Sequence, residues 1–374
     1  MKNYLFKLGG KAKKASIEIV KSKKKDKVLR DYCNLILKNH LKIISENKKD
    51  LEKAKSQKLK ENLIKRLLLD KEKILQIINS IKMIIKFKDP VNITLNKWKR
   101  PSGLKIKKVT TSIGVIAVIY ESRPNVTSDV ASLCFKSGNP VILKGGSEAY
   151  HSNKFLINLV RKALIKNKVN KDYVQFIDYK SRKVVDFLLT KMANFIDVII
   201  PRGGKNLVKK IQNLSKIPVI GHLEGICHTY IDNNADLSMS KKITLNAKLR
   251  NTAICGATET ILIHQKSLKK FCNPILSYLE ENGCKIVGDN KIKKFYKGKI
   301  RIAKESDWSK EYLSSIVSVK SVKNINEAIS HINKYGTMHT DAIITKNPKS
   351  AKIFLKEVKS SIAMHNTSTQ FADG

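Results

Sequence analysis

The sequence contains no run of about 18 apolar residues, the length that a membrane span requires. Its N-terminal stretch, residues 1–25, carries charges throughout and has no apolar segment of the signal-peptide type. The six cysteines form no Cys-x-x-Cys pair. The group His222, Cys227 and His228 matches no standard zinc spacing, so no metal site is predicted. Together these absences predict a cytoplasmic protein with reduced thiols.

Acidic and aromatic residues are also scarce. The chain has 31 Asp and Glu against 74 Lys and Arg, which gives a formal net charge of +43, and aromatic residues make up 6%. A basic nucleic-acid-binding protein is one interpretation of this charge. A lysine-rich surface is the other, and the scarcity of arginine and of stacking aromatics favours it. In either case the positive field attracts anionic substrates such as phosphates.

Hydrophobic periodicity predicts two folded domains in the 374 residues. Residues 1 to about 88 show the three- and four-residue spacing of helices, and 97–108 form a turn or exposed hairpin. Beyond residue 113 strands and helices alternate, which predicts doubly wound parallel sheets. The predicted strands are 113–120, 140–144, 174–177, 197–200, 219–220, 260–263, 285–287, 316–319, 341–345 and 361–364. The predicted helices are 127–136, 147–166, 181–191, 205–214, 235–248, 268–281 and 325–334.

Two glycine turns follow predicted strands, where ligands bind in sheets of this kind. Lys144-Gly145-Gly146-Ser147-Glu148 offers a cation for a phosphate or a ribose, and Pro201-Arg202-Gly203-Gly204-Lys205 opens a helix whose N–H groups favour phosphate. Neither turn is the Gly-x-Gly-x-x-Gly fingerprint. Two ordinary glycine turns therefore remain the alternative to a cofactor site.

Cys255 lies at a predicted turn between a helix and a strand, beside Gly256, which lets the backbone approach a ligand closely. This is a suitable position for a nucleophilic thiolate. A single cysteine is more often a packing residue, so the turn alone leaves both interpretations open.

Three blocks of sequence resemble a known family. They are residues 114–129 (GVIAVIYESRPNVTSD), residues 246–260 (NAKLRNTAICGATET), and residues 339–344 (HTDAII) together with 366–374 (NTSTQFADG). They are similar to glutamate-5-semialdehyde dehydrogenases, also called gamma-glutamyl phosphate reductases, within the aldehyde dehydrogenase superfamily. The resemblance implies an aldehyde-dehydrogenase-like α/β fold. Residues 1–225 would form N-terminal helices and a doubly wound NADP-binding domain, 226–365 a smaller α/β catalytic domain, and 97–108 part of an oligomerisation hairpin.

The resemblance implies the second step of proline synthesis from glutamate, in which NADPH reduces L-glutamyl 5-phosphate to L-glutamate 5-semialdehyde with release of phosphate. Cys255 would be the nucleophile, in thiolate form favoured by basic residues such as Arg250. Asn125 would donate to the oxyanion. The cofactor-binding residues that the family pattern implies are Lys144, Ser147, Glu148, Gly203, Gly204 and Glu311.

Two departures from the family pattern stand out. His222 occupies the place of the general-base glutamate of hydrolytic aldehyde dehydrogenases, which suits an enzyme that must not hydrolyse its thioester. The family continues beyond Gly374 with a glycine-rich tail, so residues 366–374 are expected to begin a truncated tail. An inactive member with poor dimerisation is therefore an alternative. The implied partners are the substrate, a second copy of the chain, and glutamate 5-kinase as a candidate for channelling.

Overall fold

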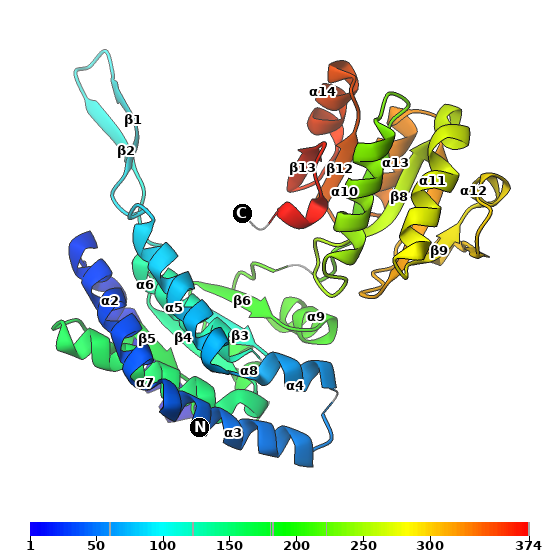
Figure 1. Cartoon of the computed structure of the whole chain (residues 1–374). Coiled ribbons are helices and arrows are strands. Elements are labelled where there is room, and N and C mark those ends of the chain that lie inside the picture. The colour runs from blue at the N-terminus through cyan, green and yellow to red at the C-terminus, as the bar shows by residue number, and fades with distance from the viewer. Residues whose placement is uncertain (60, 122, 180, 182, 222, 373–374) are drawn as a thin grey trace. The chain divides into compact units, whose positions relative to one another are not determined.

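The computed structural model describes residues 1–59, 61–121, 123–179, 181, 183–221 and 223–372. The chain divides into two compact units, residues 1–223 and 224–374 (Figure 1). Each unit is described by itself. Within the described ranges, no helix is long and apolar enough to cross a membrane.

Helices form the N-terminal part of the first unit, as the periodicity predicts. Asp70 begins the fifth of them by accepting a hydrogen bond from the Lys73 N–H at 2.8 Å, an N-cap that satisfies a first-turn donor. An exposed antiparallel hairpin follows them. These elements are α1 (Lys2–Ile17), α2 (Ser22–Lys38), α3 (His40–Ser56), α4 (Glu61–Leu67), α5 (Lys71–Lys86), β1 (Thr94–Lys99) and β2 (Lys105–Val109).

A parallel sheet forms the centre of the first unit, and its described strands follow the order β5-β4-β3-β6. The chain winds outward from β3 to β5 and then returns to place β6 on the other side of β3. The strand order therefore reverses at β3, which is the topological switch point where such sheets bind ligands. The elements are β3 (Ile116–Tyr120), α6 (Pro124–Lys136), β4 (Val141–Gly145), α7 (Tyr150–Lys166), β5 (Val174–Phe176), α8 (Lys183–Lys191), β6 (Val198–Arg202) and α9 (Lys205–Leu214).

Both faces of this sheet are buried. Alternate residues of the β3 segment point to opposite faces. Val118 belongs to the core shared with α2, α5, α6 and α7, and Ala117 to the core shared with α1, α8 and α9. Burial on both faces explains the continuous apolar run that the sequence shows here.

The second unit contains another parallel sheet, with its described strands in the order β10-β9-β11-β8-β7-β12-β13. Helices α10 to α12 cover one face, and α13 and α14 cover the other. The elements are β7 (Cys227–Ile231), α10 (Leu237–Leu249), β8 (Thr258–His264), α11 (Leu268–Glu281), β9 (Lys285–Gly288), α12 (Asn290–Phe295), β10 (Ile300–Ile302), β11 (Ile316–Val322), α13 (Ile325–Tyr335), β12 (Thr340–Ile344), α14 (Pro348–Glu357) and β13 (Ile362–His365).

The structure differs from the predicted elements in several places, and it contains α12, β10 and α14, which were not predicted. Residues 219–220 form only an isolated bridge from Val219 to Ile199, not a strand. Strand β7 was not predicted, because His228 and Thr229 interrupt its apolar pattern. Both are fully buried. Asp341 accepts from the His228 N–H and pairs with its Nδ1, and Thr258 pairs with the Thr229 hydroxyl, whereas the His228 Nε2 has no partner among the described residues.

We expect the first unit to depend on packing beneath β4. Ile142 is fully buried in the core that β3 and β4 share with α1, α8 and α9. Ile142→Ala should lower the free energy of unfolding by about 2–5 kcal/mol, because it removes buried methyl groups and leaves a cavity. Thermal and urea denaturation measure this loss.

The matched control is Ile165→Ala on α7, where the side chain is 56% exposed. This variant should change stability by less than about 0.5 kcal/mol. Equal losses in the two variants would contradict the packing assigned to β4.

Candidate active site

The carboxyl ends of β3, β4 and β6 meet at one edge of the first sheet. Tyr120, the last residue of β3, pairs with Gly145 of β4 and with Arg202 of β6. The two glycine turns predicted from the sequence therefore lie on either side of the segment that follows β3. This edge is the position expected for a dinucleotide.

Lys144 is the last residue but one of β4. Its side chain is buried, and its Nζ donates to the Gly145 carbonyl oxygen at 2.7 Å. Burial lowers the pKa of Lys144, and the nearby Glu148 carboxylate opposes that shift. Ser147 and Glu148 follow in a short 3₁₀ turn, Ser147–Ala149, with Ser147 exposed. The turn thus offers an ammonium, a hydroxyl and a carboxylate, which suit the hydroxyls of a ribose.

The second glycine turn leads into α9. The Gly204 N–H donates to the Glu121 Oε2 at 2.8 Å, and a Cβ on Gly203 would stand 2.6 Å from the same oxygen. A carboxylate therefore lies at the start of the helix, where the dipole favours negative charge. In this structure the Gly204 N–H is therefore occupied by a carboxylate of the chain itself.

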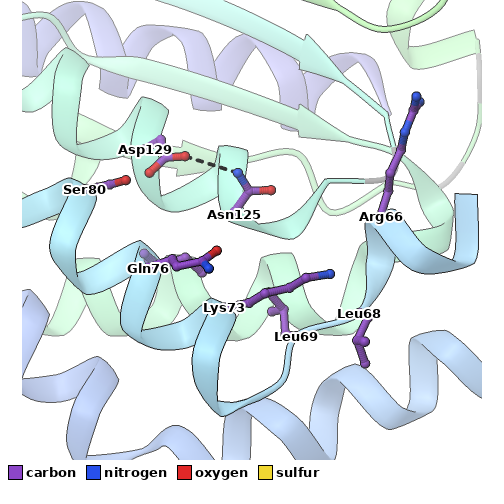
Figure 2. Close-up of a pocket in the computed structure, with 9 residues that line it drawn as sticks. Arg66, Leu68, Leu69, Lys73, Gln76, Ser80, Asn125 and Asp129 are labelled. Atoms are coloured by element: carbon purple, nitrogen blue, oxygen red, sulfur yellow. Dashed lines mark hydrogen bonds between the residues drawn. The ribbon is translucent and has the colours of Figure 1, made fainter. Parts of the chain in front are cut away.

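Asn125 lies in the first turn of α6, where Pro124 occupies the first helical position. Its side chain is exposed, and its Nδ2 donates to the Asp129 Oδ2 at 3.3 Å. Figure 2 shows both side chains on the side of α6 that faces α5. The amide is thus held by a residue one turn along the same helix.

Cys255 belongs to the loop that joins α10 to β8 in the second unit, and its side chain is half-buried. A Cβ on Gly225 would stand 2.1 Å from the Cys255 carbonyl oxygen, so the two backbones are in close contact. The Cys227 thiol donates to the same oxygen at 3.1 Å. Burial raises the pKa of Cys227 well above its ordinary value, so Cys227 stays a neutral donor that supports the loop.

A buried ion pair lies at the base of this loop. The Lys248 Nζ, near the end of α10, contacts the Glu259 Oε2 on β8 at 2.5 Å, and both side chains are about 1% exposed or less. Glu259 also accepts a hydrogen bond from the Leu313 N–H at 3.3 Å. The pair therefore connects both ends of the cysteine loop to the segment that contains Glu311.

Glu311 contacts Gly225, the residue whose backbone lies against Cys255. The Glu311 Oε1 accepts a hydrogen bond from the Gly225 N–H at 2.8 Å. Its segment is held by Asp307, which receives both terminal nitrogens of Arg301 at 2.6 and 2.9 Å and the Tyr312 hydroxyl at 3.0 Å. The arrangement brings Glu311 and the Cys255 backbone together through Gly225.

The 3₁₀ turn Thr369–Phe371 packs against the cysteine loop from the other side. The Gln370 Nε2 donates to the Ala247 and Asn251 carbonyl oxygens at 2.9 and 3.3 Å. Arg250 donates to the Gln370 carbonyl oxygen at 3.4 Å and lies over the Phe371 ring. Arg250 thus connects the loop to this turn, and its effect on the thiol stays a prediction.

The predicted residues fall into two groups. The first unit contains Asn125, Lys144, Ser147, Glu148, Gly203 and Gly204, and the second contains Cys255 and Glu311. His222 lies outside the described residues. Sequence reasoning did not single out Glu121 and Asp129, the carboxylates that contact Gly204 and Asn125. Both residues belong to the 114–129 block that resembles the family, so this block was the signal that could have pointed to them.

Comparison with known proteins identifies relatives along the chain. Residues 24–291 match the model of the aldehyde dehydrogenase family. A protein of Bartonella quintana named gamma-glutamyl phosphate reductase is 44% identical over 98% of this chain and 89% of its own length. One of Brucella suis with the same name is 42% identical, over 98% and 87%. The crystal structure of gamma-glutamyl phosphate reductase from Thermotoga maritima matches with a TM-score of 0.95 at 34% identity, over 98% and 89%.

The Glu311 segment generates a prediction about pH. Hydrogen bonds, first from Arg301, lower the pKa of Asp307 from 3.8 to about 2. Because the folded-state pKa is lower than the unfolded one, this interaction stabilises the fold above about pH 4. The stabilisation is lost as the pH falls through 2. Asp307→Asn should therefore lower stability by about 1–2 kcal/mol at pH 7, and the difference from the parent should shrink between pH 4 and 2.

Urea denaturation at several pH values measures the difference. Glu61→Gln is the control, because Glu61 pairs with Lys65 where both side chains are more than 70% exposed. A difference for Asp307→Asn that does not change between pH 4 and 2 would contradict the role given to this ion pair.

Proposed function

The chain belongs to the gamma-glutamyl phosphate reductase family of aldehyde dehydrogenases, and from this premise we propose its reaction. It reduces L-glutamyl 5-phosphate to L-glutamate 5-semialdehyde with NADPH and releases phosphate. This is the second step of proline synthesis from glutamate. The observation that carries the proposal is the half-buried Cys255 thiol, on a loop held against Gly225 beside Glu311.

Cys255 is the nucleophile of this reaction. Its thiolate attacks the acyl carbon of the substrate, the C–O bond to phosphate breaks, and a thioester forms on the Cys255 sulfur. Covalent catalysis divides one difficult displacement into two easier steps. The loop must therefore hold the sulfur in place while the thioester forms and is reduced. The contacts from Gly225 and Cys227 to the Cys255 carbonyl oxygen support that role.

Asn125 donates to the acyl oxygen as negative charge develops on it. The amide has two N–H bonds, and one is used by Asp129 in the described structure. The hydrogen bond to Asp129 orients the amide, so the donor needs little rearrangement when the substrate binds.

The residues at the edge of the first sheet fit a dinucleotide. Lys144, Ser147 and Glu148 supply donors and an acceptor for ribose hydroxyls, and the turn at Gly203 and Gly204 supplies backbone N–H groups at the start of α9. The Glu121 carboxylate accepts from one of these N–H groups, so it must move aside when a pyrophosphate binds at this turn. NADPH, when bound, supplies the hydride that converts the thioester to a thiohemiacetal, from which the aldehyde leaves and the Cys255 thiol is restored.

The hairpin of β1 and β2 suits contact with a second copy of the chain. Its strands are exposed, with Leu95 and Trp98 of β1 at 60% and 43% exposure, and Leu104 in the connecting turn is 60% exposed. Exposed apolar side chains on an extended hairpin are typical of an interaction surface. A homodimer built through this hairpin is part of the proposal.

Cys255→Ala tests the nucleophile. In the reverse direction, phosphate-dependent reduction of NADP by glutamate semialdehyde should fall by at least about a thousandfold, because no other step can form the thioester. NADPH binding, measured by fluorescence titration, should persist.

Cys284→Ala is the matched control, since this buried thiol packs in the core below α11. It should keep nearly full activity. Turnover retained in Cys255→Ala would sink the assignment. A parent chain that binds NADPH but never turns over would instead support an inactive family member. Salt-sensitive binding of nucleic acid without NADPH binding would support the nucleic-acid interpretation.

Lys144→Met tests the cofactor site. We expect the Kd for NADPH to rise about tenfold or more, because a partly desolvated cation at the ribose position is lost. Lys162→Met, an exposed lysine on α7, is the control and should bind NADPH normally. An unchanged Kd in Lys144→Met would place the cofactor elsewhere. The same titration with NADH measures the preference between the two cofactors.

A further inference from the structure

A cavity of about 270 Å³ opens in the first unit between α4, α5 and α6. Asn125, the proposed oxyanion donor, forms part of its wall. Most of the other lining side chains are polar, and they include cations as well as a carboxylate (Figure 2). The lining residues are Arg66, Leu68, Leu69, Lys73, Gln76, Ile77, Ser80, Asn125 and Asp129.

Asp129 is the acidic group of this cavity, and one of its oxygens lacks a partner. The Oδ2 accepts a hydrogen bond from Asn125, whereas the Oδ1 is buried and has no hydrogen-bond partner among the described residues. Burial raises the pKa of Asp129, and the Asn125 hydrogen bond opposes the shift. An unsatisfied buried carboxylate oxygen is costly, so a cationic donor from a ligand would stabilise it.

Lys73 and Arg66 supply positive charge to the same cavity. The Lys73 Nζ donates to the Lys65 carbonyl oxygen at 2.9 Å and keeps two further N–H bonds. The Arg66 guanidinium has no hydrogen bond or ion pair to any residue in the described ranges. Figure 2 shows the Lys73 side chain extending from α5 toward the end of the cavity where Arg66 stands, away from Asp129. The cavity therefore has an acidic end and a basic end.

Asn125 and Asp129 lie side by side on α6. They are four residues apart, a rise of about 6 Å along the helix axis, and the Asn125 Nδ2 meets the Asp129 Oδ2 at 3.3 Å. In a glutamyl chain four bonds separate the reacting carbon from the α-nitrogen. A substrate whose acyl oxygen accepts the second Asn125 N–H can therefore bring its amino group to the Asp129 Oδ1.

We propose that this cavity binds the α-amino-acid end of the substrate, with Asp129 receiving the α-ammonium group and Lys73 the α-carboxylate. Arg66 adds positive potential at the carboxylate end. The inference rests on the proposed function, which places the acyl oxygen at Asn125. It assigns selection for an α-amino acid to the first unit, on helices that carry no part of the cysteine loop.

Three aldehydes test the contacts of Asp129 and Lys73 independently of each other. L-glutamate 5-semialdehyde carries both charged groups, 5-oxopentanoate lacks the amino group, and 4-aminobutanal lacks the carboxylate. Each is oxidised with NADP and phosphate, and kcat/KM is measured for the parent and the variants. The parent should favour glutamate semialdehyde over either analogue by about tenfold or more.

Asp129→Asn should lower kcat/KM about 10- to 100-fold more for the two amines than for 5-oxopentanoate, whose smaller loss measures only the weaker orientation of Asn125. Lys73→Met should lower it by about tenfold for the two carboxylates and spare 4-aminobutanal. The KM for NADP should not change in either variant. Controls are Glu52→Gln on α3 and Lys71→Met on α5, both exposed residues that do not line the cavity.

Equal losses for all three aldehydes in Asp129→Asn would overturn the inference, because they would show that Asp129 only positions Asn125. Unchanged discrimination in both variants would overturn it as well. A binding measurement separates this outcome from failure of the proposed function. Calorimetric titration with L-glutamate and with glutarate needs no turnover. The parent should prefer L-glutamate, and Asp129→Asn should lose that preference; equal binding of both acids by the parent would refute the inference.

Discussion

The close contact between the Gly225 backbone and Cys255 is the constraint on which the second half of the site depends. A residue with a Cβ at position 225 would overlap the Cys255 carbonyl oxygen, so the approach requires glycine. The same glycine donates its N–H to Glu311. Gly225 therefore positions both the cysteine loop and the Glu311 carboxylate, because each of them contacts its backbone.

The buried pair of Lys248 and Glu259 supports this arrangement from below. Removing two charges from water is expensive, and their attraction offsets that cost only with good geometry and further hydrogen bonds. The Leu313 N–H supplies one such bond to Glu259. The pair joins the end of α10, the start of β8 and the Glu311 segment, so we interpret its role as fixing the position of the cysteine loop.

Carboxylates have particular roles in a chain with a net charge of +43. Lysines spread over the surface attract an anionic acyl phosphate and an anionic cofactor without selecting between them. Selection requires charges at defined positions. Asp129 on α6, which accepts from Asn125, is the carboxylate that we propose for this role. It would distinguish an α-amino acid from a simple dicarboxylate.

The sequence by itself determined the family, through its 114–129 and 246–260 blocks, and the parallel α/β fold, because strands buried on both faces show as continuous apolar runs. It did not reveal β7, since His228 is buried there only by virtue of Asp341, more than a hundred residues away. Only the tertiary structure placed Glu121 on the Gly204 turn and left one Asp129 oxygen without a partner. Local patterns record which side chains are buried, whereas the partners of a buried polar group come from segments that only folding brings together.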